Sequence, residues 1–204
     1  MTDAGITGRA APPPHRPEGD AGAWAIPTLV TERLTLRAPG PGDHPAFAAF
    51  YESDAARHVG GPMAPALSWR YLSEVIGHWA MRGFGRWAVD RRDAPGRAVG
   101  LVGLHFPLDW PEPEVGWYVW EGLGRGYAKE AGRAALRHAY ETLGWTTAIS
   151  MIKPGNDASA GVARALGAVR EADHAHPRFG TMMIFRHPGP DALGSGSLRP
   201  EAPR

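Results

Sequence analysis

The chain has 204 residues, which is enough for one domain with a full hydrophobic core. Its formal net charge of +1 gives no electrostatic support for binding nucleic acid or a membrane surface. The absence of cysteine excludes disulfides, thiolate zinc sites and a covalent intermediate on a cysteine.

Both ends of the chain differ in composition from its middle. Residues 1–27 and 189–204 are rich in Pro, Gly, Ala and charged residues, so we predict two flexible tails around a single domain at 28–188. The N-terminal stretch lacks the basic start and apolar core of a secretory signal. No apolar run approaches the roughly 20 residues that span a bilayer, so we expect a cytoplasmic protein.

The first part of the domain is predicted to contain one strand and two helices. Leu34 and Leu36 alternate with polar residues, which indicates a half-buried strand. Asp43 is suited to cap a short helix over 44–53, and a second helix is expected over 66–82. The apolar side of the second helix is predicted to comprise Leu67, Tyr71, Leu72, Val75, Ile76 and Trp79.

The remaining segments alternate between strand and helix patterns. Strands are predicted over 84–92, 98–106, 114–120, 145–152, 168–172 and 179–187, and helices over 127–143 and 158–166. The turn chemistry of residues 93–97 joins the first two of these strands in a hairpin. We therefore predict an α+β, three-layer fold: a mostly antiparallel sheet of six to seven strands with helices on both faces.

A glycine-rich loop follows the strand at 114–120. Gly122, Gly124 and Gly126 stand in five positions, and a helix pattern starts directly behind them. Glycine allows backbone N–H groups to approach a ligand closely, and the first amides of a helix are unpaired and electropositive. This arrangement predicts a phosphate-binding site.

The sequence of the loop excludes two common phosphate ligands. Tyr127 and Ala128 follow Gly126, where a nucleoside triphosphate loop needs Lys and a hydroxyl residue. A dinucleotide fingerprint starting at Gly124 would need glycine in place of Lys129, and no acidic residue follows at the distance that holds a ribose.

The chain resembles the GNAT acetyltransferases, in particular the branch similar to ribosomal-protein N-terminal acetyltransferases. The coenzyme loop of that superfamily matches residues 123–128 apart from Leu123 at its first position, and the branch pattern Gly-Arg-Gly-Tyr-Ala-x-Glu-Ala is complete at 124–131. The other matching segments, in chain order, are 32–37, Asn156-Asp157-Ala158-Ser159, Leu166-Gly167-Ala168 and Arg186-His187-Pro188.

The resemblance implies acetyl-CoA as cosubstrate and no metal. It also implies that strands 114–120 and 145–152 diverge in a V that holds the pantetheine arm. Arg125 and Lys129 either meet phosphates of the coenzyme or belong to a solvated helix face. The residues expected to contact acetyl-CoA are Tyr118, Val119, Trp120, Leu123, Gly124, Arg125, Gly126, Tyr127, Ala128, Lys129, Asn156 and Ser159.

Asn156 and Ser159 have two interpretations. Their spacing fits the cap of a helix. The resemblance implies instead that Ser159 protonates the leaving sulfur, directly or through water, because the position that carries a tyrosine in many GNAT enzymes is Ala163 here. Both interpretations stay open.

Three residues are candidates for the general base that deprotonates the acceptor: Glu114, His105 and Glu112. His174 and His176 lack a third ligand at suitable spacing, so we assign no metal site.

The acceptor site is expected at residues 57–63 together with Trp79, Phe84 and Trp87. We predict an N-acetyltransferase, monomeric or homodimeric, that acts on a primary amine, either a peptide N-terminus or a small amine. The alternative is a coenzyme A-binding module without catalysis, which the departures at Leu123 and Ala163 motivate.

Overall fold

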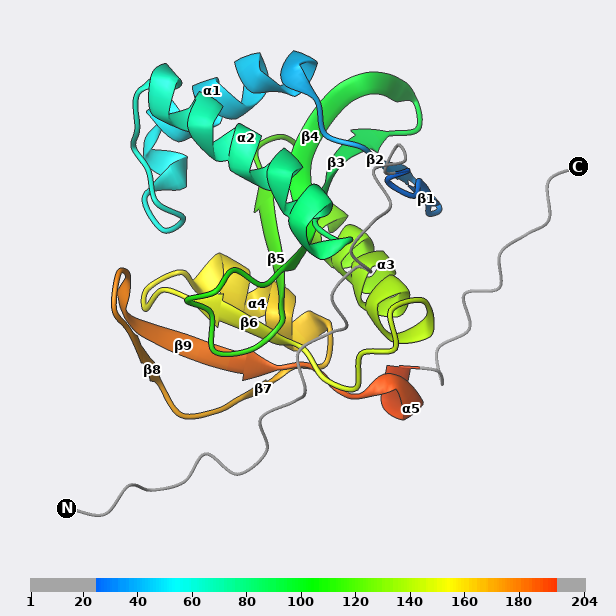
Figure 1. The fold of residues 1–204 in the computed structure, drawn as a ribbon, viewed down its shortest axis with the longest axis vertical. Coiled ribbons are helices and arrows are strands. Elements are labelled where there is room, and N and C mark those ends of the chain that lie inside the picture. Colours follow the sequence, from blue (N-terminus) through cyan, green and yellow to red (C-terminus); the bar gives the residue numbers. More distant parts are fainter. Residues whose placement is uncertain (1–24, 194–204) are drawn as a thin grey trace, which may run out of the picture.

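The computed structural model describes residues 25–193 of the chain as nine strands and five α-helices (Figure 1). The strands are β1 (Leu29–Val30), β2 (Leu34–Arg37), β3 (Arg86–Arg91), β4 (Ala94–His105), β5 (Glu114–Val119), β6 (Ile149–Ile152), β7 (Val169–Arg170), β8 (His174–His176) and β9 (Gly180–Arg186). The α-helices are α1 (His44–Glu52), α2 (Pro65–Arg82), α3 (Tyr127–Glu141), α4 (Asp157–Ala165) and α5 (Pro190–Leu193). Within this described range, no helix is long and apolar enough to cross a membrane.

All nine strands form one sheet in the order β1-β2-β3-β4-β5-β6-β9-β7, with β8 also paired to β9. Every pairing is antiparallel except that of β5 with β6. The prediction of six to seven strands was too low, because β1 and β8 were missed. Strands of two and three residues are too short to show an alternating pattern.

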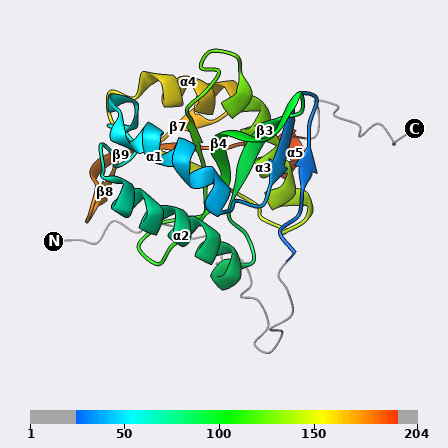
Figure 2. The same cartoon turned by 90° about the horizontal axis from the view of Figure 1, so that it is seen from above.

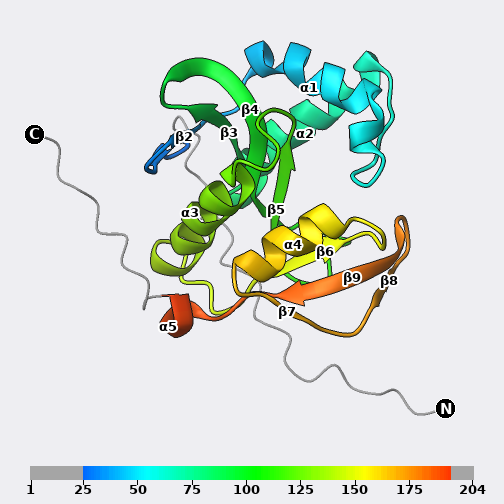
Figure 3. The ribbon, with the colours of Figure 1, turned by 180° about the vertical axis from the view of Figure 1, so that it is seen from behind.

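The sheet lies between two layers of helices, as predicted. Helices α1 and α2 cover one face, and α3 and α4 cover the other (Figures 2 and 3). On the first face, Phe47, Tyr51 and Leu72 pack against Leu101 of β4. On the second face, α3 packs through an alanine-rich stripe that lets it approach the sheet closely.

Two predicted details in the first helices differ from the structure. Asp43 is the N-cap residue of α1, as predicted, but its side chain makes no capping bond to that helix; it accepts from Gly40 N and pairs with Arg37 at 2.6 Å. Leu67 is half exposed, because the buried stripe of α2 runs through Ser68, Leu72, Val75 and Trp79 at helical spacing. Leu67 lies one position outside that stripe.

The predicted tails are described only in part. Ile26 packs against the core on the α3 side, and Trp87 Nε1 donates to the carbonyl of Pro27 at 2.7 Å. The single turn of α5 lies within the predicted C-terminal tail. Residues 1–24 and 194–204, and the predictions made for them, lie outside the described residues.

Candidate active site

The two parallel strands of the sheet separate almost as soon as they meet. The only paired residues of β5 and β6 in the described chain are Glu114 and Ile149. At the next position the Ser150 hydroxyl donates to the carbonyl of Val115 at 2.6 Å, and its oxygen lies 2.9 Å from His187 Nε2. A side chain therefore bridges the strands where the backbone ladder stops, and the predicted divergence is present.

Backbone groups of β5 are left facing this gap. Pro113 and Val115 direct their carbonyls toward β6, while Trp120 N donates to Val99 of β4 on the other side. Because backbone groups alternate in direction along a strand, those of Trp117 and Val119 also face the gap. They are placed to bind an extended, amide-containing ligand between the strands.

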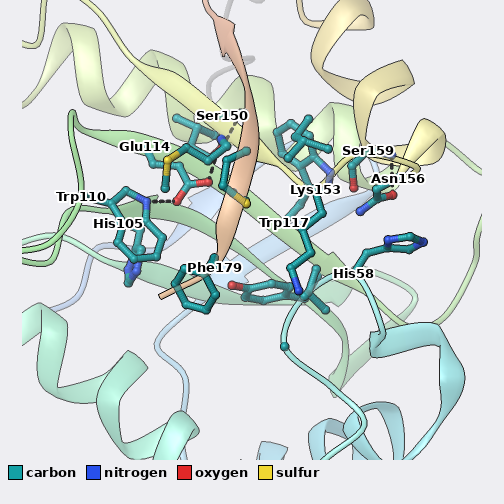
Figure 4. Close-up of a pocket in the computed structure, with 18 of the residues that line it drawn as sticks. His58, His105, Trp110, Glu114, Trp117, Ser150, Lys153, Asn156, Ser159 and Phe179 are labelled. Carbon is teal, nitrogen blue, oxygen red and sulfur yellow. Dashed lines mark hydrogen bonds between the residues drawn. The ribbon is translucent and has the colours of Figure 1, made fainter. Parts of the chain in front are cut away.

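A cleft opens at the divergence (Figure 4). Its walls come from α2 and α4, from strands β3 to β6 and β9, from the loops after α1, β4 and β6, and from the turn before β9. The lining residues are His58, Val59, Gly60, Tyr71, Arg86, His105, Trp110, Glu114, Val115, Gly116, Trp117, Tyr118, Ser150, Met151, Ile152, Lys153, Asn156, Ser159, Phe179 and Met182.

The glycine loop lies between the end of β5 and the start of α3. Gly122, Gly124 and Gly126 have φ angles of +73°, +79° and +81°, a left-handed conformation that favours glycine. A Cβ atom on Gly124 would meet no atom within 4 Å, so the loop is open at this position. Together with the amide groups at the start of α3, this geometry suits a phosphate group.

Two sequence motifs that are distant in the chain meet beside this loop. Glu130 in the first turn of α3 accepts from Arg33 N at 2.9 Å, from Arg33 Nε at 2.7 Å and from Thr31 Oγ1 at 2.5 Å. Arg33 Nη1 also donates to the carbonyl of Arg125 at 3.0 Å. The guanidinium thus holds the loop in place and neutralises a carboxylate that would otherwise repel an anion.

Glu114 lies at the closed end of the divergence. Its Oε1 accepts from Met151 N at 3.2 Å, its Oε2 accepts from Trp110 Nε1 at 2.6 Å, and Oε2 is 3.8 Å from Arg86 Nη2. Burial raises the pKa of Glu114, and the positive charge of Arg86 opposes that rise. A carboxyl group with a raised pKa is suited to accept a proton near neutral pH.

The other two predicted bases are less suited to that role. His105 lines the cleft, but burial and the charge of Arg86 lower the pKa of His105 well below its ordinary value, and its ring stacks on His78. Glu112 does not line the cleft, and its two oxygens accept hydrogen bonds from Arg186 at 2.8 and 2.7 Å.

Asn156 and Ser159 line the opposite end of the cleft from Glu114 (Figure 4). Asn156 is the N-cap of α4, and its Oδ1 accepts from Ser159 N at 3.2 Å, as the capping interpretation predicts. Ala163 is fully buried in the core under α4, so that position faces away from the cleft.

The predicted acceptor wall is partly wrong. His58, Val59 and Gly60 line the cleft, but Trp79, Phe84 and Trp87 are buried in the core cluster on the α3 side. Their aromatic side chains fill the core, which is the common role of such residues. The residues from other elements that line the cleft instead, and that sequence reasoning missed, are Tyr71, Arg86, Trp110, Phe179 and Met182.

One of these missed residues left a signal in the sequence. Arg86 follows Phe84 and precedes Trp87 within a predicted buried strand, where a charged residue is uncommon unless it is paired or functional. Two aromatic residues that were predicted to contact acetyl-CoA, Tyr118 in β5 and Trp120 directly after it, differ in position. Trp120 packs on Phe47 and Phe50 and lies outside the cleft lining, while Tyr118 lines it and bonds Tyr71.

His174 and His176 lie in β8, and His176 Nδ1 accepts from the backbone N–H groups of Arg178 and Phe179. One of its two ring nitrogens is therefore already used. Among residues 25–193, no group of three or more His, Asp or Glu side chains is placed to hold a metal ion.

The split parallel strand pair and the open glycine loop form a site suited to a ligand with an extended amide-containing arm and a phosphate group. Sequence comparison gives the family: the acetyltransferase (GNAT) domain matches residues 33–169. The chain belongs to the GNAT acetyltransferase family.

Solved structures agree with this assignment. An acetyltransferase from Agrobacterium tumefaciens is 34% identical with a TM-score of 0.74, and the match covers 83% of this chain and 98% of that one. A GNAT-family acetyltransferase from Bacillus anthracis shares the fold at 20% identity and a TM-score of 0.63, with 78% and 96% of the two chains covered. RimL, a ribosomal L7/L12 α-N-protein acetyltransferase in complex with coenzyme A, does so at 15% identity and 0.62, with 78% and 94% covered.

Proposed function

We propose that this protein is an acetyl-CoA-dependent N-acetyltransferase that moves an acetyl group to a primary amine by direct attack in a ternary complex. The observation that carries the proposal is the position of Glu114, a buried carboxyl group at the closed end of the gap between β5 and β6. The amine would be a peptide N-terminus or a small molecule.

The donor would lie along the gap with its pyrophosphate at the glycine loop. The backbone groups of Trp117 and Val119 that face the gap suit the amide-containing pantetheine arm, and the amide groups of the glycine loop suit the phosphates. The thioester would then face the cleft, where a backbone N–H of β5 would stabilise the oxyanion.

The amine must lose a proton before it attacks. In the proposed mechanism Glu114 accepts one proton from the ammonium through water, and the neutral nitrogen attacks the thioester carbon as the C–S bond breaks. Ser159, or a water beside it, supplies the proton that the leaving sulfur takes up. The nitrogen loses its second proton as the amide forms, and this proton replaces the one given to the sulfur. The net products are the amide, coenzyme A and one proton.

The test is coenzyme A release from acetyl-CoA with a mixed panel of primary amines and short peptides, each compared with the rate without an acceptor. We expect amine-dependent release together with an acetylated product of the expected mass. Tight acetyl-CoA binding without release for any amine would contradict the proposal and favour the coenzyme A-binding module.

Ser159→Ala is expected to lower kcat by about 10²-fold while acetyl-CoA affinity changes little, because it removes a positioned proton donor and retains the fold. Single-turnover kinetics and calorimetry measure the two effects separately. The matched control is Ser73→Ala on the exposed side of α2, where the hydroxyl bonds only the carbonyl of Trp69. An unchanged kcat in Ser159→Ala would leave Ser159 with its helix-start role alone.

A further inference from the structure

A buried arginine reaches the cleft from two strands away. Arg86 on β3 is 3% exposed and pairs with Gly103 of β4, which in turn pairs with Gly116 of β5. A Cβ atom on Gly116 would lie 3.2 Å from Arg86 Nη2. The absence of a side chain on Gly116 therefore leaves the space in which the guanidinium extends to β5 and the wall of the cleft.

The guanidinium has donors that nothing satisfies within residues 25–193. Its Nε and Nη1 are buried and have no hydrogen-bond partner there. Glu114 Oε2 lies 3.8 Å from Nη2, beyond hydrogen-bond distance, and both Glu114 oxygens already accept other bonds. The Tyr118 ring, 4.8 Å from Cζ, offers only its face.

Such an arrangement is costly for stability. Arginine stays charged in a protein, and a buried charge without hydrogen bonds is destabilising. The missing interactions match those of a carboxylate, which accepts from a guanidinium through two parallel bonds. Arg86 lines the cleft, so a carboxylate bound there would accept from its guanidinium.

The charged residues of the cleft also favour a ligand that carries a carboxylate. Besides Arg86, its lining contains Lys153, which lies between the Glu114 group and the Asn156–Ser159 pair (Figure 4), and Glu114 is the one acidic residue of that lining. Two cations against one carboxyl group disfavour a purely cationic acceptor. They favour an acceptor that brings a negative charge with its amine.

We propose that the acceptor is an α-amino acid whose free carboxylate is bound by Arg86 and whose amine faces Glu114. The proposal rests on the proposed function and narrows it to one class of amine. The short distance between Arg86 and Glu114 requires that amine and carboxylate lie close together, as they do on one α-carbon.

The side chain of the amino acid would be apolar. Beside Glu114 the cleft is walled by Trp110, Phe179, Met151 and Met182, which pack together in one cluster. Aromatic and thioether groups form an adaptable apolar surface that binds large hydrophobic side chains. Phenylalanine, leucine and methionine are therefore suitable probes.

The test compares each of these amino acids with its α-amide, which retains the amine and side chain and lacks the negative charge. We expect kcat/KM for the amino acid to exceed that for the amide by about 10²-fold, because the amide leaves Arg86 unpaired. The amine of the amide, like a peptide α-amine with a pKa of about 7.7 to 8.0, deprotonates more readily. That difference favours the amide and works against the expected result.

Arg86→Gln is expected to bring the ratio of the two kcat/KM values close to one, and Arg86→Lys to restore part of it. If Arg86 acted only indirectly, through Glu114, the substitution would lower kcat/KM for both substrates equally and leave their ratio unchanged. The control is Arg97→Gln in the β3–β4 hairpin, where the guanidinium is exposed and pairs with Glu121, and the ratio should stay at the wild-type value. Equal rates for acid and amide in the wild type, a preference for peptides, or a ratio that Arg86→Gln leaves unchanged would each overturn the proposal.

Binding separates this proposal from the proposed function. Thermal unfolding in the presence of the same amino acids and amides requires no turnover. We expect the amino acids alone to raise the melting temperature of the wild type, and Arg86→Gln to lose that shift. If the amino acids stabilise the protein but are not acetylated, the proposed function is contradicted and the carboxylate site is supported. If the amides are acetylated as well as the amino acids, the carboxylate site is contradicted and the proposed function is supported.

Discussion

Glu114→Gln is expected to lower kcat at neutral pH by about 10²-fold, because it removes the group that accepts the proton of the acceptor. The substitution retains the shape of the side chain and an oxygen for the N–H groups of Met151 or Trp110, so the fold should persist. The measurement is a pH–rate profile under saturating acetyl-CoA, with melting temperature as the check on folding.

The pH dependence has a defined sign. A base works in its deprotonated form, so wild-type activity should fall as pH drops through the pKa of Glu114. Since burial raises the pKa of Glu114, this fall should occur above the ordinary range of a carboxyl group. In Glu114→Gln the rate should recover at alkaline pH, where an amine with a pKa of about 7.7 to 10.4 deprotonates unaided.

Glu112→Gln is the matched control, since it makes the same chemical change two residues away at a carboxylate that pairs with Arg186 outside the cleft lining. Its profile should follow the wild type. A Glu114→Gln profile that overlays the wild type at every pH would remove Glu114 from the mechanism. A profile shifted only by His105→Ala would assign the base to His105 instead.

The sequence predicted the fold well where elements are long. Alternating or helical periodicity identified seven strands and all four of the longer helices, and the βαβ unit from 114 to 152 predicted the one parallel pair. It failed for β1 and β8, which have two and three residues, whereas the two-residue β7 was predicted as part of the hairpin segment 168–172. It also extended β6 back to Trp145, whose side chain is buried against Phe84 and gives an apolar signal without a strand.

The site was predicted less completely, and the reason is geometric. Glu114, His105, Asn156 and Ser159 line the cleft, and they were predicted because they stand at the ends of predicted elements or within a motif. Arg86 was missed because its contact with the cleft depends on the register of three neighbouring strands, which the pattern along a single strand does not reveal. Phe179 lies in the turn before β9 and Met182 lies in β9, and the contact of this strand with the cleft depends on the order of the sheet.

Gly124→Asp is expected to weaken acetyl-CoA binding about tenfold more than Gly124→Asn, a difference of about 1.4 kcal/mol. The two side chains have the same shape, and both Asn and Asp tolerate the left-handed conformation that Gly124 adopts at φ +79°. Only the charge differs. A carboxylate at the open side of the loop would repel the pyrophosphate, and this repulsion should shrink as salt is added.

Calorimetry with acetyl-CoA at two salt concentrations measures both effects. Gly144→Asn at the far end of α3 is the control for backbone strain, because Gly144 has a φ of +69° and equally open surroundings. Its affinity should equal that of the wild type. Equal affinities of Gly124→Asp and Gly124→Asn for acetyl-CoA at low salt would show that the phosphates do not bind beside Gly124. The amide groups of α3 would then have to bind them without the glycine loop. A tenfold gap that closes at high salt would instead tie the glycine loop to an anionic ligand through charge, independently of any assay of acetyl transfer.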